Sequence, residues 1–300
     1  MKNRLLIVGC GDIAARTAAL LGKHYQLFGL SRKAENYRNL RALGITPIAG
    51  DLDQPASLRK ISGLAPHTVL HLAPPPGDGE RDTRTLHLLS ALSRHAAKIQ
   101  KSILPQQLAY ISTSGVYGDC NGNRVSENYP VSPKNARAFR RLDAERQIRS
   151  WGIRNGVRVS ILRVPGIYAQ DRLPIERLKQ GTPALLPAED SYTNHIHADD
   201  LARIIVAALR FGRSGRIYNA NDDSCLKMGE YFDLVADHFN LPHPKRITRQ
   251  EAREMISPSL LSFMLESRRL TNERIKRELR VRLRYPTVAD CLVSMNRDID

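Results

Sequence analysis

The sequence predicts an α/β fold in which a doubly wound parallel sheet carries a smaller, mostly helical C-terminal cap. The first half of the chain alternates short, continuous apolar runs with segments of helical periodicity. This rhythm is typical of βαβ units that build a parallel sheet with helices on both faces. After Pro165 the pattern changes to short helical segments separated by prolines. The change predicts that a second, helical layer follows the sheet.

The expected strands are apolar runs that read as segments buried on both faces. In chain order, they cover residues 5–8, 25–30, 45–49, 68–73, 108–112 and 157–164. Between them, apolar residues at three- and four-residue spacing predict helices at 13–21, 34–43 and 83–99. A helix at 201–209 and a strand at 216–219 are expected to return to the sheet, and helices at 231–239 and 271–279 belong to the cap.

Composition excludes several classes of protein. Hydrophobic residues are 42% and charged residues 25% of the 300 residues, which is ordinary for a folded chain and excludes wholesale disorder. Uncharged apolar runs are too short to span a membrane, which needs about 18 such residues. The four cysteines are far apart and fit neither metal-ligand nor CxxC spacing, so we expect reduced thiols, no metal and a cytoplasmic protein.

The charge balance is strongly basic. The chain has 46 basic and 30 acidic residues, a net charge of +16, which suggests anionic partners such as phosphates. Nucleic acid is not expected, because a dedicated motif is missing and aromatic residues are only 6%.

A glycine-rich turn follows the first expected strand. Residues 9–14 read Gly-Cys-Gly-Asp-Ile-Ala, which fits the G-x-G-x-x-G/A pattern between a buried strand and a helix. Gly9 permits the tight turn, Gly11 lets the backbone approach a pyrophosphate, and the helix start at Asp12 and Ile13 offers free N–H groups to it. The turn predicts dinucleotide binding, and a merely structural turn is the alternative.

The end of the second strand favours one dinucleotide over the other. An NAD site would place a carboxylate about 20 residues after the turn. Here the strand ends with Ser31, Arg32 and Lys33, and Glu35 is the next carboxylate. Because a guanidinium can pair with a 2′-phosphate, we expect NADP, with NAD as the less favoured cofactor. The alternative is that Arg32 is a solvated surface cation.

Several further motifs, taken in order, resemble the extended and atypical short-chain dehydrogenase/reductases, the nucleotide-sugar epimerase/dehydratase group. They are the turn at 9–14, Gly-Asp-Leu at 50–52, His-Leu-Ala-Pro at 71–74, and the segments 111–118, 162–168 and 194–201. The resemblance implies that Asp51 and Leu52 lie at the adenine and that Ala73 and Pro74 lie along the cofactor. It also implies that a small substrate binds below the cap.

With this resemblance, the domain expectation becomes specific. Residues 1–165 are expected to form an NAD(P)-binding domain of the Rossmann type, completed by residues 196–220. Residues 166–195 and 221–300 are expected to form the substrate-binding cap.

The catalytic positions implied by the resemblance depart from its pattern. The family uses a Ser or Thr near the fifth strand and a Tyr-x-x-x-Lys pair on the next helix. The alignment places Thr113 at the first position, Arg137 at the tyrosine and Arg141 at the lysine. Arginine stays protonated and is a poor proton donor, but Arg137 could stabilise an oxyanion and Arg141 could hold the nicotinamide ribose.

Other side chains could supply the missing proton. They are Tyr117, Tyr168, His195 and His197. For the tyrosines, packing within loops is the favoured interpretation. For the histidines it is a hydrogen bond that anchors the cap loop.

Together these observations predict an NAD(P)-dependent oxidoreductase or epimerase/dehydratase-like enzyme. We expect it to prefer NADP, to act on a small substrate that could be anionic, and to be a monomer or homodimer. The alternative is a catalytically inactive NAD(P)-binding sensor or regulatory protein, which the missing tyrosine favours.

Overall fold

The computed structural model describes residues 2–93, 104–257, 260–261 and 264–297. Within these ranges, no helix combines the length and the apolar character that crossing a bilayer requires. The four cysteines are unpaired thiols.

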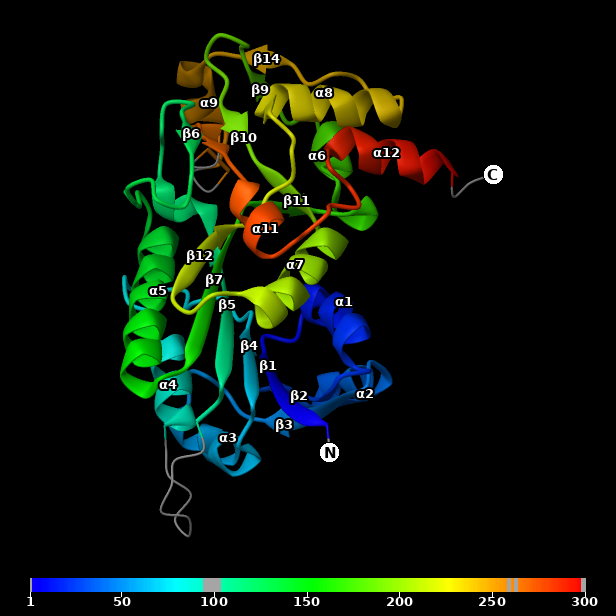
Figure 1. Cartoon of the computed structure of the whole chain (residues 1–300). Helices are drawn as coiled ribbons and strands as arrows, with labels where there is room; N and C mark the ends of the chain where they lie inside the picture. Colours follow the sequence, from blue (N-terminus) through cyan, green and yellow to red (C-terminus); the bar gives the residue numbers. More distant parts are fainter. Residues whose placement is uncertain (1, 94–103, 258–259, 262–263, 298–300) are drawn as a thin grey trace.

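A parallel sheet forms the centre of the molecule, in the order β12-β7-β5-β4-β1-β2-β3 (Figure 1). Its strands are β1 Asn3–Val8, β2 Tyr25–Ser31, β3 Ile45–Ala49, β4 Thr68–His71, β5 Gln107–Thr113, β7 Arg158–Val164 and β12 Arg216–Asn219. The strand order reverses between β1 and β4, and in such sheets ligands bind beyond the carboxyl ends of the strands at this point. The predicted fold class is therefore confirmed. β4 ends two residues earlier than expected, because a run of three prolines follows.

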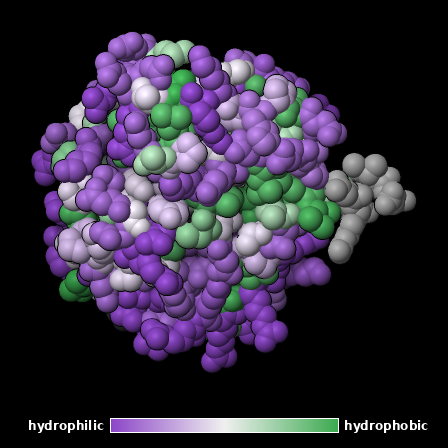
Figure 2. Space-filling model, turned by 90° about the horizontal axis from the view of Figure 1, so that it is seen from above, coloured by the Kyte–Doolittle hydropathy of each residue, from purple (hydrophilic) through white to green (hydrophobic). Residues whose placement is uncertain are grey.

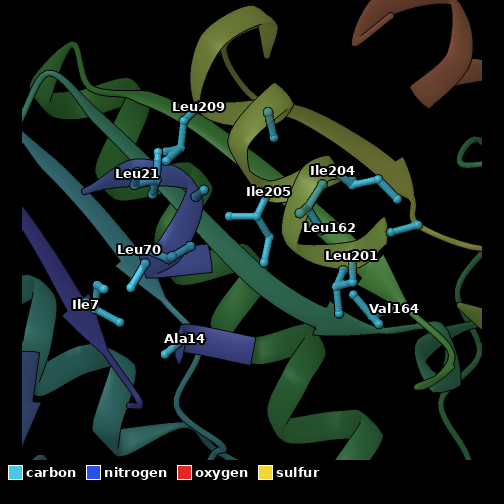
Figure 3. Packing of buried hydrophobic residues seen from close by; sticks show 14 of the residues in the cluster. Ile7, Ala14, Leu21, Leu70, Leu162, Val164, Leu201, Ile204, Ile205 and Leu209 are labelled. Carbon is cyan, nitrogen blue, oxygen red and sulfur yellow. The ribbon is translucent and has the colours of Figure 1, made fainter. Parts of the chain in front are cut away.

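Helices cover both faces of the sheet. Leu5 and Ile7 of β1 face one side and Leu6 and Val8 the other, and all four are buried, as alternation along a central strand requires. Side chains of α1 (Asp12–Leu21) and α7 (Ala198–Phe211) pack on the first face (Figure 3).

The opposite face is covered by three helices, α3 (Arg59–Leu64), α4 (Thr83–Leu92) and α5 (Ala136–Asn155). The helix expected at 83–99 corresponds to α4, which ends at Leu92, and residues 94–99 lie outside the described ranges. The helix expected at 34–43 begins as the 3₁₀ turn η1 (Ala34–Asn36) and continues as α2 (Tyr37–Ala42).

A second layer lies above the carboxyl ends of the strands (Figure 1). We call its helices the cap: α6 (Ile175–Lys179), α8 (Met228–His238), α9 (Arg249–Met255) and α12 (Val288–Arg297). Phe232, Val235 and Val288 form the centre of its core. Seen from above, the surface is mostly hydrophilic, with an apolar strip toward one side (Figure 2).

Short strand pairs also form outside the central sheet. They are β8 (Gly166–Tyr168) with β11 (His195–His197), β9 (Ala184–Leu185) with β14 (Arg246–Ile247), β10 (Tyr192–Thr193) with β13 (Leu226–Lys227), and β6 (Arg124–Val125) with β15 (Arg269–Leu270). The expected helix at 271–279 forms as α11 (Glu273–Glu278), and its Ile275 packs into the sheet core rather than into the cap core.

Candidate functional site

The glycine turn joins β1 to α1 at the carboxyl edge of the sheet. Gly9 has a φ of +96°, and a Cβ there would lie 2.4 Å from the backbone nitrogen of Ala73. Gly11 differs, because a Cβ there would meet no heavy atom within 4 Å. Gly11 is also the N-cap of α1 and supplies no side chain to cap the first N–H groups, those at Asp12 and Ile13 among them. The turn therefore offers open space beside uncapped donors, as anion binding requires.

The end of β2 carries the residues that we expected at the 2′-phosphate. Ser31 is buried, and its hydroxyl donates a hydrogen bond to the carbonyl of Lys33 at 3.2 Å. Arg32 is exposed. The hydrogen bonds from Arg84 lower the pKa of the Asp53 carboxyl, and the positive charge of Arg32 adds to this effect. Arg32 thus lies at the same edge as the loop after β3.

Arg84 of α4 ties together the loops that follow β3 and β4. Its Nε and Nη2 donate to the two carboxylate oxygens of Asp53 at 2.7 and 2.6 Å, and its Nη1 donates to the carbonyl of Pro74 at 3.2 Å. The Asp51 carboxylate accepts the N–H of Asp53 at 3.0 Å. His87 Nδ1 lies 2.7 Å from the carbonyl of Leu52.

Sequence reasoning missed Arg84. A single arginine in an amphipathic helix gives no local signal of this role.

Thr113 ends β5, and the two arginines project from α5. The Thr113 hydroxyl oxygen accepts the N–H of Gly115 at 3.2 Å, which leaves its own hydrogen available for a bound oxygen. Burial lowers the pKa of Arg137, and the neighbouring positive charge of Arg141 acts in the same direction.

Arg141 points at the ends of two strands. Its Nη1 donates to the carbonyl of Ile111 at 2.7 Å, to the Tyr110 hydroxyl at 3.1 Å and to the carbonyl of Ala73 at 3.4 Å. The structure therefore places Arg141 next to Ala73, which was expected along the cofactor.

A cavity of about 600 Å³ lies between the strand ends and the cap, and it brings Thr113 and Arg137 together. Its charged lining also includes five residues that sequence reasoning did not assign to a site: Arg172, Glu176, Arg177, Glu266 and Arg268. They come from two segments that are far apart in the sequence, so no motif connects them. The lining also contains the aromatic rings of Tyr168, Tyr192, Tyr231 and Phe232.

Hydrogen bonds hold Arg268 in the lining of this cavity. Its Nη1 donates to the carbonyl of Gly118 at 2.7 Å and to the Glu266 carboxylate at 2.8 Å, while its Nε is buried without a hydrogen-bond partner. The cavity thus combines positive charge with aromatic surface, a combination suited to an anionic ligand that also has a ring to stack.

The other expected proton donors divide into two groups. Tyr117 donates to the Asn219 side chain at 2.8 Å, and His197 accepts the N–H of Asp199 as the N-cap of α7, so both are engaged in structural contacts. Tyr168 and His195 line the cavity. Burial lowers the pKa of His195 to about 4, so its imidazole is neutral at pH 7.

Comparison with known proteins agrees with this geometry. The profile of the NAD dependent epimerase/dehydratase family matches residues 11–220, which is more than half of the chain. The chain belongs to the NAD-dependent epimerase/dehydratase family.

The chain is similar to a known reductase and to several solved structures. GDP-6-deoxy-D-mannose reductase of Pseudomonas aeruginosa is 26% identical over 280 residues, which cover 85% of this chain and 88% of that protein. A conserved protein of unknown function from Silicibacter pomeroyi is 27% identical, with full coverage of both chains and a TM-score of 0.80.

A more distant structure shares the fold. UDP-glucuronic acid 4-epimerase from Bacillus cereus, in complex with UDP-glucuronic acid and NAD, has a TM-score of 0.75 at 18% identity and covers 99% of this chain and all of that one.

Membership of the epimerase/dehydratase family implies a nicotinamide dinucleotide, and the residues present fit one. The open space at Gly11 and the uncapped start of α1 are where its phosphates would bind. Among the described residues, no group of three or more His, Cys, Asp and Glu side chains is arranged to hold a metal ion.

Proposed function

We propose that this chain is an NAD(P)-dependent oxidoreductase or epimerase/dehydratase-like enzyme that prefers NADP and acts on a small anionic substrate. The observation that carries this proposal is the cavity of about 600 Å³ at the carboxyl edge of the sheet, lined by both Thr113 and Arg137. Its volume falls in the range of small-molecule sites. Residues 1–165 with 196–220 would hold the cofactor, and the remaining segments would hold the substrate.

Three side chains have different roles in the proposed reaction. When bound, the nicotinamide supplies or accepts a hydride. Thr113 donates a hydrogen bond to the reacting oxygen, and the positive charge of Arg137 stabilises negative charge that develops on that oxygen. Arg141 keeps the nicotinamide ribose beside the ends of β4 and β5.

The substrate class follows from the charge of the cavity. Apart from Arg172, which also faces the glycine turn, the lining has three arginines, Arg137, Arg177 and Arg268, against two glutamates, Glu176 and Glu266. The name of the Pseudomonas aeruginosa relative supports a nucleoside-diphosphate sugar, which has both the negative charge and a base that can stack on an aromatic ring.

A second function is favoured by the composition of α5. The twenty residues of this helix contain neither tyrosine nor lysine, so the usual proton donor and its partner are replaced by Arg137 and Arg141. A sensor that binds NAD(P) without turnover would have this property. Hydride exchange between NADPH and a panel of carbonyl compounds distinguishes the two functions, because the sensor would show none.

The cofactor preference is tested by titrating NADPH and NADH against the wild type and Arg32→Ala. We expect tighter NADPH binding in the wild type. The substitution should weaken NADPH binding about 10- to 150-fold, since one charge-assisted phosphate contact contributes about 1.5–3 kcal/mol. NADH binding should change little, and Arg38→Ala, which removes an exposed arginine of α2, is the charge-matched control. Equal wild-type affinities for the two nucleotides would reject the NADP assignment.

A further inference from the structure

A network of ion pairs connects the glycine turn with the segment that leads into the cap. Arg16 Nε donates to both carboxylate oxygens of Asp12 at 3.0 and 3.1 Å, and Arg16 Nη1 donates to Asp199 at 2.6 Å. Arg16 Nη2 also lies 3.6 Å from Asp171. From the other side, Arg172 Nη2 approaches the Asp12 carboxylate to 3.5 Å. The network therefore joins α1, α7 and the 3₁₀ turn η4 (Gln170–Arg172).

The negative charge of Asp12 would oppose the binding of a phosphate group at the glycine turn. Asp12 is the first residue of α1, whose uncapped N–H groups would receive the pyrophosphate. A carboxylate at that place repels a second anion unless cations neutralise it. The network contains three carboxylates, from Asp12, Asp171 and Asp199, and two guanidiniums. Removing either arginine would leave the turn facing a larger negative charge.

The two arginines are held to different degrees. Arg16 makes three hydrogen bonds of 2.6 to 3.1 Å within the network. Arg172 contributes a contact of 3.5 Å, longer than the 2.7–2.9 Å typical of charge-assisted hydrogen bonds, and its side chain is 38% exposed. Arg172 also lines the substrate cavity, whereas its ion pair reaches the glycine turn. Its guanidinium thus lies between the two candidate sites and is not fixed by its present partner.

We propose that Arg172 binds the pyrophosphate of the dinucleotide, sharing its guanidinium between that group and Asp12. The inference rests on the proposed dinucleotide binding. Several N–H donors in one plane allow a guanidinium to contact two phosphate oxygens while it still faces a carboxylate. Binding would draw Gln170–Arg172 against the glycine turn and so connect cofactor binding to the wall of the substrate cavity.

The proposal predicts opposite effects for the two partners of the pair. Arg172→Gln should weaken NADPH binding about 10- to 100-fold. Arg172→Lys should weaken it less, since lysine keeps the positive charge but lacks the planar guanidinium with its several N–H donors. Asp12→Asn should leave NADPH binding equal or tighter, because it removes a repulsive charge and releases Arg172 from its pair. Arg203→Gln, which removes a half-exposed arginine of α7, is the charge-matched control and should bind NADPH as the wild type does.

Two other ligands show whether Arg172 contacts the pyrophosphate of the dinucleotide or another phosphate group. Adenosine 2′-monophosphate has no pyrophosphate, so Arg172→Gln should bind it as the wild type does. GDP tests the alternative that Arg172 contacts the diphosphate of a substrate in the cavity, and its affinity should change less than twofold. Loss of GDP binding with intact NADPH binding would overturn the proposal in favour of that alternative.

Hydrogen exchange gives a readout that does not depend on affinity alone. At saturating NADPH, backbone amides of residues 169–173 should exchange more slowly in the wild type, whereas Arg172→Gln should show little protection there. Wild-type protein that binds neither NADPH nor NADH would refute the proposed function itself. Wild-type binding with an unchanged Kd in Arg172→Gln would refute only this inference. If Arg172→Gln does not fold, loss of NADPH affinity in Asp12→Asn would contradict it.

Discussion

The structure requires glycine at Gly9 but not at Gly11, the other glycine of the glycine turn. At Gly9 the φ of +96° disfavours any other residue, and the backbone of Ala73 lies where a side chain would start. At Gly11 the space is open within the protein, so a side chain there would collide only with a ligand. One glycine is therefore required by the fold and the other by the proposed cofactor.

This difference predicts two distinct outcomes. Gly9→Ala should lower the free energy of unfolding by about 2 kcal/mol or more, because a strained φ and a backbone contact of 2.4 Å act together. Gly11→Val should keep the wild-type stability and lose NADPH binding. Chemical unfolding measures the first effect and nucleotide titration the second. A folded Gly11→Val that binds NADPH normally would mean that the turn is purely structural.

A buried ion pair near the middle of α5 fixes the position of this helix against the sheet. The Glu145 carboxylate accepts hydrogen bonds from Ser112 Oγ at 2.6 Å and from Arg163 Nη2 at 2.7 Å. All three residues are buried, so this pair fastens α5 to β5 and β7. Because a helix is stiff over two turns, the anchored register also fixes where Arg137 and Arg141 leave the helix.

The assigned roles on α5 are tested by separate substitutions. Arg137→Ala should reduce turnover about 10²- to 10³-fold with little change in NADPH affinity, as expected for the loss of one oxyanion-stabilising group. Arg141→Ala should weaken both. Arg146→Ala, on the exposed side of the same helix, should change neither. The double variant Arg137→Tyr with Arg141→Lys restores the proton donor of the family pattern.

An active wild type that loses no rate on Arg137→Ala would remove Arg137 from the reaction. Tyr168 and His195, which line the same cavity, would then be the next candidates for the proton donor.

We expect the protein to lose stability as the pH falls below neutral. Burial lowers the pKa of His71 to about 3, with the charge of Arg141 acting in the same direction, and burial lowers that of His195 to about 4. In the unfolded chain both groups titrate near 6.5. Below that pH the unfolded chain binds protons that the folded chain excludes, so stability falls as pH falls from about 6.5. Asp222 acts in the opposite direction, since burial raises its pKa to about 7.

His71→Gln tests this balance and keeps a polar partner for Thr85, whose Oγ1 lies 2.9 Å from His71 Nε2. Between about pH 4 and 6, the variant should lose stability less steeply than the wild type, by about 1.4 kcal/mol per pH unit. Urea unfolding at several pH values measures the two slopes. Parallel slopes would show that His71 is protonated in the folded state at these pH values.

The sequence alone determined the sheet and the glycine turn. These features depend on signals carried within a few neighbouring residues: apolar runs, helical spacing, and glycines where a turn needs them. β3 and β12 occur at the predicted residues for this reason. The family resemblance supplied Thr113, Arg137 and Arg141, because the motifs that carry it occur in a fixed order along the chain.

Only the tertiary structure decided how distant charges are combined. Arg172 meets Asp12, Arg84 meets Asp53, and Arg163 meets Glu145, and no local pattern distinguishes these arginines from the other basic residues of the chain. The cavity likewise arises from segments that approach one another when the cap packs over the strand ends. An ion pair or a cavity wall depends on distances in space, which periodicity and spacing along the chain do not encode.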